Sequence, residues 1–317
     1  MDGSNLSAME ESLVHRFLDS SKQENRTLAD IIMNKIREKD DDNEDALEDA
    51  SQVPDVMPPK VVEVYTLVGK MLHSYKAGKL PKALKMLPHL RNWEDVLWLT
   101  RPDEWSASAT FACTRIFASN LNDKMAQRFY SMVLLEKCRD DIRSNNKLNY
   151  HLYMALKKAL FKPGAFYKGI LLPLAMSRTC TLREATIIGS VLTKVSIPAN
   201  HSAAALLRLA TMQYSGSTSL FIRVLINKKY ALPRRVVDEL VNHFISFENE
   251  TKELPVLWHQ SLLAFAQRYK FELNDAQRNS FKSLLKAQQH HQMTSEIRRE
   301  LFSQQNPHFA AGSMTAF

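Results

Sequence analysis

Proline residues divide most of this chain into short segments with helical periodicity. Five of them lie at or just before the start of such a segment, where proline's missing N–H is not needed: Pro102, Pro163, Pro198, Pro233 and Pro255. The 317 residues include only 8 glycines, and no Asn-Gly or Asp-Gly pair marks a hairpin. A strand-rich fold is therefore disfavoured. We predict an all-α chain.

The first predicted helix begins at Pro59 and ends near Gly78. The others are expected at about 92–99, 103–119, 121–142, 149–161, 164–176, 181–194, 199–213, 217–227, 233–246, 255–270, 274–287 and 294–303. Suitable N-cap residues are Asn149, Thr181, Asn274 and Thr294. Many short antiparallel helices joined by brief turns predict an α-α superhelix, or solenoid. The sequence shows no fixed repeat length.

Apolar residues at helical spacing predict which faces are buried. Between residues 255 and 270 they recur at intervals of four, three and four: Trp258, Leu262, Phe265 and Tyr269. Between residues 149 and 161 they form one stripe: Leu152, Ala155, Leu156, Ala159 and Leu160. We expect both sets in the core.

Charge divides the chain into regions. Residues 1–59 hold 15 acids and 6 bases, whereas residues 60–317 hold 19 acids and 36 bases. We expect an acidic leader and linker at 1–58, a helical body at 59–304 and a C-terminal tail at 305–317. Within the leader, the amphipathic stretch LADIIMNKI predicts a short helix that docks on a partner.

We expect no export signal, because the stretch MDGSNLSAME is acidic and polar. No membrane association is expected either. The longest apolar run, Gly169 to Met176, is far shorter than the roughly 20 residues that a membrane span requires.

Positive charge is concentrated between Ile142 and Val237. This stretch contains fifteen Lys and Arg residues and only one acid, Glu184. A surface with almost no carboxylates favours a partner that supplies negative charge, and phosphate is the obvious one. The candidate RNA-binding residues are Lys147, Lys157, Lys158, Lys162, Lys168, Arg178, Arg183, Lys228, Lys229, Arg234 and Arg235.

Spacing supports these candidates. Lys158 and Lys162 are four residues apart, and like charges at that spacing destabilise an isolated helix. A negatively charged ligand would offset this repulsion. Phe166 and Tyr167, beside Lys168, could stack on unpaired bases. The alternative is that Phe161 and Phe166 hold one helix against the next.

No set of residues for catalysis or cofactor binding is found. The phosphate-loop patterns GxxxxGK[ST] and GxGxxG and the metalloprotease pattern HExxH are absent. Neither the pair His290 and His291 nor the separate Cys113, Cys138 and Cys180 has the spacing of a metal site. We expect no enzyme activity, metal, cofactor or small-molecule substrate.

Several long stretches resemble the bystin family of eukaryotic small-subunit ribosome assembly factors. They follow in family order over about Val61 to Glu300 and include RIFASNLNDKMAQRFYSMVLLEKCRDDI, LNYHLYMALKKALFKPGAFYKGILLPL, YSGSTSLFIRVLINKKYALPRRVVD and ELPVLWHQSLLAFAQRYK. Family members usually carry a longer, basic N-terminal extension, where this sequence has a short acidic leader.

The resemblance implies a HEAT-like solenoid without catalytic activity. It implies binding to pre-40S particles near the head and beak, with pre-18S ribosomal RNA, small-subunit ribosomal proteins and other assembly factors as partners. It also implies a location in the nucleolus and nucleus, with export to the cytoplasm on late particles. The alternative is a protein–protein adaptor of the adhesion-complex type, whose basic face binds acidic proteins.

Overall fold

The computed structural model describes residues 57–302, and in this range every regular element is helical. The elements are α3 (Pro59–Ser74), α4 (Lys82–Met86), η1 (Leu87–His89), α5 (Trp93–Leu99), η2 (Pro102–Glu104), α6 (Ala107–Asn120), α7 (Asp123–Phe129), η3 (Tyr130–Leu135), α8 (Glu136–Asn145), α9 (Tyr150–Ala159), α10 (Pro163–Phe166), η4 (Tyr167–Leu171), α11 (Leu172–Met176), α12 (Leu182–Lys194), α13 (Ala199–Ala210), α14 (Gly216–Ile226), α15 (Arg234–Ile245), α16 (Val256–Tyr269), η5 (Lys270–Glu272), α17 (Asp275–Ala287) and α18 (Met293–Phe302). All of them belong to the unit that begins at Pro59. The predicted all-α class is confirmed for the described residues.

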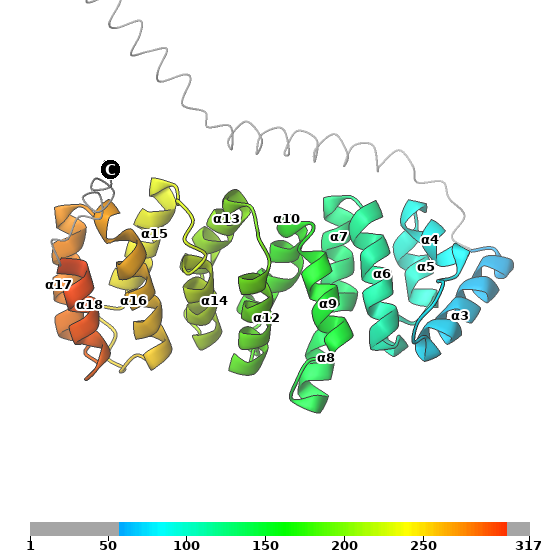
Figure 1. Ribbon diagram of the computed structural model, residues 1–317, viewed down its shortest axis with the longest axis horizontal. Helices are drawn as coiled ribbons and strands as arrows, with labels where there is room; N and C mark the ends of the chain where they lie inside the picture. Colours follow the sequence, from blue (N-terminus) through cyan, green and yellow to red (C-terminus); the bar gives the residue numbers. More distant parts are fainter. Residues whose placement is uncertain (1–56, 303–317) are drawn as a thin grey trace, which may run out of the picture. The chain divides into compact units, whose positions relative to one another are not determined.

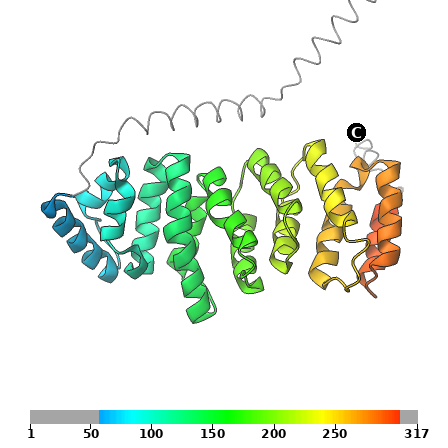
Figure 2. The same ribbon diagram turned by 180° about the vertical axis from the view of Figure 1, so that it is seen from behind.

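From α6 onward the helices form two layers, and alternate helices along the chain are neighbours (Figures 1 and 2). In the first layer, α6 packs on α9, α9 on α12, α12 on α14, α14 on α16 and α16 on α18. The second layer contains the continuous helical stretches α7–η3–α8 and α10–η4–α11, followed by α13, α15 and α17. Successive segments therefore alternate between layers and bury their apolar faces between them.

Hydrogen bonds join each turn of this array to the next. They link residues 30 to 45 positions apart. Examples are Tyr230 Oη to the Ile197 carbonyl, His243 Nδ1 to the Ala210 carbonyl and Gln288 to the Phe247 carbonyl. The period is thus about one helix pair, but it varies from pair to pair. This variation explains why no fixed repeat length is visible in the sequence.

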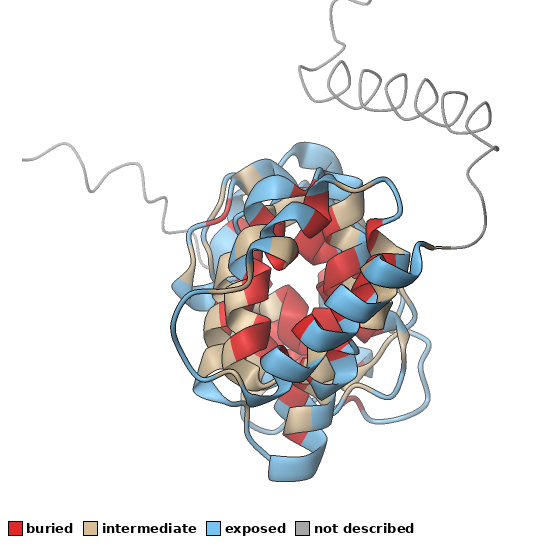
Figure 3. Cartoon of the chain, turned by 90° about the vertical axis from the view of Figure 1, so that its right-hand side faces the viewer, coloured by how far each residue is buried: buried red, intermediate tan, exposed pale blue. Residues whose placement is uncertain are grey.

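The core lies between the layers, with exposed residues facing outward when the molecule is viewed from the α3 end (Figure 3). Both predicted apolar sets are buried, from Trp258 to Tyr269 in α16 and from Leu152 to Leu160 at α9. Gly169 in η4 allows one of the closest approaches, because an added Cβ would lie 2.6 Å from the carbonyl oxygen of Gln127 in α7. The predictions of the core are confirmed.

Several local predictions need correction. Helix α4 was not expected, and the predicted helix 103–119 is two elements, because extended backbone at Trp105 and Ser106 separates η2 from α6. Thr294 lies inside α18 and does not cap it. The caps Asn149, Thr181 and Asn274 are confirmed, and each accepts a backbone N–H. The stretch LADIIMNKI lies outside the described residues.

Two stretches within long helices are π-helical, η3 and η4. The three cysteines are free. His290 and His291 lie in the turn before α18, with their rings stacked at 4.5 Å.

Within residues 57–302, no helix combines the length and the apolar character that a bilayer crossing needs. In the same range, no group of three or more His, Cys, Asp or Glu side chains is placed to hold a metal ion.

Candidate nucleic-acid interface

The first-layer helices have their starts at one edge of the array and their ends at the other. Arg183, at the start of α12, donates to the Asn146 side chain in the turn before α9. Beyond the ends of α12 and α14, Tyr230 donates to Ile197. We call these the N-terminal edge and the C-terminal edge. They lie about 20 Å apart along α12, which has 13 residues.

The structure does not bring all the predicted RNA-binding residues together. Those at the N-terminal edge are Lys147, Arg178 and Arg183. Those at the C-terminal edge are Lys157, Lys158, Lys162, Lys228, Lys229, Arg234 and Arg235. Lys168 lies apart from both groups, exposed in η4 of the second layer. A single continuous stripe of these side chains is therefore not present.

Three of the predicted residues are occupied by contacts within the fold. Lys228 Nζ donates to the carbonyls of Leu192, Thr193 and Val195, at 3.1, 3.3 and 2.7 Å, and so caps the end of α12. Burial lowers the pKa of its ammonium group.

Lys162 and Arg234 are similarly engaged. Lys162 donates to the Leu121 carbonyl and lies 3.3 Å from Asp123. Arg234 donates to the Glu272 carbonyl and pairs with Asp238 at 3.2 Å. These cations hold one turn of the array to another, which leaves little of their charge for a ligand.

The remaining candidates are more open to solvent. Arg178 and Arg183 are exposed, and each donates to one side-chain amide oxygen, of Gln213 and Asn146 respectively. Exposed side chains with no hydrogen bond or ion pair to the described part of the chain belong to Lys147, Lys168, Lys229 and Arg235. Lys157 and Lys158 are half-buried in the last turn of α9.

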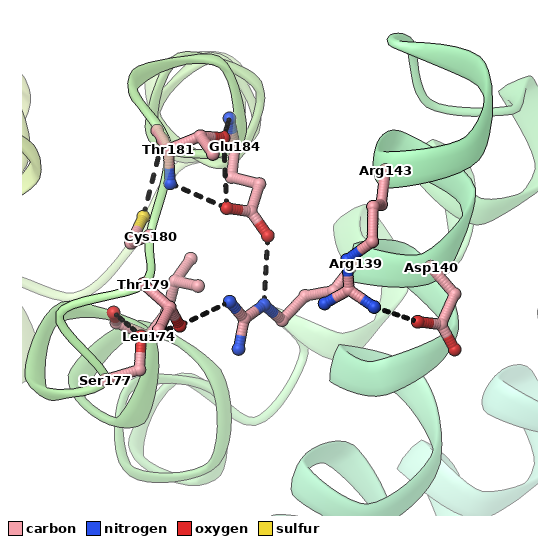
Figure 4. A network of polar contacts seen from close by, with 9 residues as sticks. All are labelled: Arg139, Asp140, Arg143, Leu174, Ser177, Thr179, Cys180, Thr181 and Glu184. Atoms are coloured by element: carbon pink, nitrogen blue, oxygen red, sulfur yellow. Dashed lines mark hydrogen bonds and ion pairs between the residues drawn. The ribbon is translucent and has the colours of Figure 1, made fainter.

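An arginine cleft of about 570 Å³ lies at the N-terminal edge between α8 and α12 (Figure 4). Its lining residues are Arg139, Ile142, Arg143, Asn146, Thr179, Thr181, Arg183 and Glu184. Arg139 Nε is 2.9 Å from Glu184 Oε1, and the two side chains are only 14% and 7% exposed. Arg139 also donates to the Thr179 hydroxyl at 2.8 Å. The charge at the centre of this cleft is thus already paired.

Glu184 is held from two sides. Its other oxygen accepts the backbone N–H of Thr181 at 2.7 Å, which completes a capping box at the start of α12. Burial raises the pKa of Glu184, but the hydrogen bonds from Thr181 and Arg139 outweigh burial and hold the pKa below its usual value. The only acid between Ile142 and Val237 therefore serves the fold.

The helices of the first layer carry almost no acids. From α6 to α16 this layer has seven Lys and Arg residues and one acid, the buried Glu184. The second-layer helices carry both signs, for example Asp123 and Arg128 in α7. We call α6, α9, α12, α14 and α16 the acid-poor layer. It ends at α18, which carries Glu296 and Glu300.

A basic cleft of about 400 Å³ opens where this layer meets the turn between α3 and α4. Its lining residues are Tyr75, Gly78, Lys79, Leu80, Lys85, Ala112, Arg115, Ile116, Ser119 and Lys158. Four of these are cations, none is a carboxylate, and Lys79, Lys85 and Arg115 are exposed. Cations without a neighbouring carboxylate are suited to hold phosphate oxygens.

Sequence reasoning identified only Lys158 of these four cations. The other three lie before Ile142, outside the base-rich stretch from Ile142 to Val237: Lys79, Lys85 and Arg115. A signal was present, since residues 64–93 contain six Lys and Arg residues and no acid. What the sequence could not show is that this segment folds against α6 and the end of α9.

The aromatic residues of this region differ from expectation. Phe166 and Tyr167 are buried, so they cannot stack on a base, and Phe166 does hold its helix in the core. For Phe161 the alternative of packing between helices is wrong, because this residue is 64% exposed. Lys158 Nζ lies 4.8 Å from the centre of that ring.

Comparison with protein families matches the bystin model to residues 22–310, which include every described helix and both clefts. The chain is 54% identical to the bystin of Bos taurus over 295 residues, covering 93% of this chain and 68% of the relative. The chain belongs to the bystin family. It is likewise 54% identical to human bystin, over 93% of this chain and 68% of the relative. It is 50% identical to the bystin of Arabidopsis thaliana, over 94% of this chain and 66% of the relative.

Membership of the bystin family agrees with the resemblance described above for residues 61–300. The match also extends beyond the described helices at both ends, into the acidic leader and the C-terminal tail. Both clefts therefore lie in the part of the chain that matches the bystin family.

Proposed function

We propose that this chain is a non-catalytic ribosome biogenesis factor that binds RNA in pre-40S particles. Its partners would be pre-18S ribosomal RNA, small-subunit ribosomal proteins of the head and other assembly factors. In this role it supports pre-rRNA processing, maturation and export, in the nucleolus and nucleus and on late particles that reach the cytoplasm. The observation that carries this proposal is the basic cleft, with four cations and no carboxylate in its lining.

The electrostatics favour a polyanion over a single charged group. A strand of RNA carries many phosphates, and a layer whose one acid, Glu184, is buried and paired does not repel the phosphates on either side of the one that is bound. Beyond the basic cleft, Lys194 in α12 and Arg223 in α14 continue the positive charge along the acid-poor layer. The backbone of one RNA segment could follow this direction.

We also propose that the two layers form a HEAT-like α-α superhelix. In support, first-layer and second-layer segments alternate along the chain, and the hydrogen bonds between turns recur after 30 to 45 residues. In such an array each pair contacts only its neighbours, so a long surface is available to one extended ligand.

The test is co-sedimentation with pre-40S particles after charge reversal in the basic cleft. Arg115→Glu combined with Lys158→Glu should leave thermal unfolding unchanged but shift the protein from pre-40S fractions to the top of a gradient. The matched control is Arg143→Glu with Arg183→Glu at the arginine cleft, which should remain with the particles. Unchanged sedimentation of the Arg115 and Lys158 variant would contradict the proposal.

The second candidate function is the protein–protein adaptor, because an acid-free cleft would also accept the carboxylates of an acidic protein. RNase treatment separates the two. Loss of association after digestion supports RNA as the ligand, whereas association that survives digestion supports an acidic protein. The non-catalytic part of the proposal is tested by a screen for nucleotide hydrolysis, where turnover above background would contradict it.

A further inference from the structure

Phe161 is an aromatic side chain that the fold leaves uncovered. It follows the last turn of α9 and the residue is 64% exposed, whereas Phe166, five residues later, is fully buried. Burying a phenylalanine side chain stabilises a fold, because its apolar surface is removed from water. The fold does not use this contribution at Phe161, so the ring is available to a ligand.

The exposed ring is joined to the basic cleft by Lys158. The ammonium group of Lys158 lies 4.8 Å from the centre of the Phe161 ring, and the same side chain lines the cleft. A ligand that reached both would meet an aromatic surface and four cations: Lys79, Lys85, Arg115 and Lys158. No carboxylate lines that cleft to compete with it.

This combination matches the two parts of an unpaired nucleotide. Phosphate oxygens bind Lys and Arg, and a base stacks on an aromatic ring whatever its identity. A duplex cannot use the ring, because the bases of an A-form helix are already stacked on one another. We propose that the basic cleft and Phe161 together bind one unpaired nucleotide of a single-stranded RNA segment, with its phosphate in the cleft and its base on the ring.

This inference rests on the proposed RNA-binding function and adds the form of the RNA and the residue that selects it. Other exposed aromatic rings occur, but they lack these surroundings. Tyr150, 69% exposed, begins α9 at the N-terminal edge, and it does not line the basic cleft. Tyr150 therefore provides a matched control for exposure without the cleft.

The experiment compares variants of the full chain in binding to a fluorescein-labelled 12-nucleotide oligouridine and to a duplex of the same length. Phe161→Leu keeps an apolar side chain but removes the ring, and we expect it to weaken binding to the single strand about fivefold or more. Phe161→Trp should restore the affinity to within about twofold of the unmodified chain, because it supplies a ring again. Duplex binding should not change with either substitution.

Three binding results would overturn the inference. They are single-strand affinity unchanged in Phe161→Leu, an equal loss on the duplex, and an equal loss in Tyr150→Ala. Because Phe161 is exposed, these variants should keep the thermal unfolding of the original chain, and a shifted melting temperature would also count against the inference.

The same titrations separate this inference from the proposed function. If Arg115→Glu with Lys158→Glu weakens RNA binding while Phe161→Leu does not, RNA binding stands and stacking on Phe161 is wrong. If the unmodified chain binds neither RNA above background, both are wrong.

Discussion

The arginine cleft and the basic cleft both gather cations, but only in the arginine cleft are two of the cations paired with carboxylates, while Arg183 there has none among the described residues. In the arginine cleft, Glu184 faces Arg139 at 2.9 Å and Asp140 faces Arg143 at 3.0 Å. In the basic cleft, no carboxylate lines the site beside the four cations. A cation already paired within the fold gains less from an external phosphate, because that contact replaces one it has. The number of cations in a region therefore does not by itself identify a phosphate site.

The largest effect that separates the clefts should come from Arg139→Met. Removing one partner of a buried ion pair leaves Glu184 charged and uncompensated, which costs about 3–5 kcal/mol. We expect the free energy of unfolding in urea to fall by that amount, while the folded protein keeps its RNA affinity. Arg143→Met is the control, because Arg143 and Asp140 are mostly exposed and their pair contributes less than about 1 kcal/mol. Unchanged stability of Arg139→Met would contradict the structural role of this cleft.

A smaller effect is expected for Lys228→Met. Its ammonium group is the donor shared by three carbonyls at the end of α12, and leaving them without it should cost about 1–3 kcal/mol of stability. Lys229→Met is the matched control, since that neighbouring side chain is exposed and should change stability by less than about 0.5 kcal/mol. Urea unfolding measures both. A Lys228→Met protein of normal stability with weakened RNA binding would show that Lys228 contacts RNA after all.

Acid should remove the contribution of Glu184. Its pKa is lower in the folded chain than in the unfolded chain, so the stability it provides is present above the usual glutamate pKa of about 4.3 and is lost as the pH falls through the folded value. We expect the stability difference between the unmodified chain and Glu184→Gln to shrink as the pH falls from 7 to below 4. Urea unfolding at several pH values measures it. A difference that does not depend on pH would mean that the carboxylate charge is not what Arg139 and Thr181 stabilise.

The smallest expected difference between the clefts is in the salt dependence of RNA affinity. Each phosphate bound from a single strand contributes about 0.7 to the log–log slope of affinity against salt. Reversing Arg115 and Lys158 should therefore make the slope shallower by about 1.4, whereas Arg143→Glu should leave it unchanged. The measurement is RNA affinity between 50 and 200 mM salt, a range over which the counterion effect is large. Equal slopes for both variants would remove the distinction between the clefts.

Local features of the sequence predicted the helices well because caps and prolines act within one turn. Thr181 and Asn274 form capping boxes, and the spacing from Trp258 to Tyr269 is the buried face of α16. The role of a cation could not be predicted in this way. The carbonyl partners of Lys228 lie 33 to 36 residues earlier, and nothing near Lys228 in sequence points to them.

The same limit applies to the basic cleft. Lys79 and Lys85 stand in a stretch without acids, which is visible in the sequence, but their proximity to Lys158 depends on how α4 and α9 pack around α6. Two similar residues also differ in burial, which the sequence did not predict. Phe161 and Phe166 flank the same Pro163–Gly164 break, yet only Phe166 enters the core.

The most direct measurement is the affinity of single-stranded RNA for the two charge-reversed pairs, by fluorescence anisotropy at one salt concentration. We predict that Arg115→Glu with Lys158→Glu weakens binding tenfold or more, about 1.4 kcal/mol, and that Arg143→Glu with Arg183→Glu changes it less than about twofold. Equal losses in the two pairs, or a larger loss at the arginine cleft, would contradict the claim that unpaired cations in the basic cleft bind RNA.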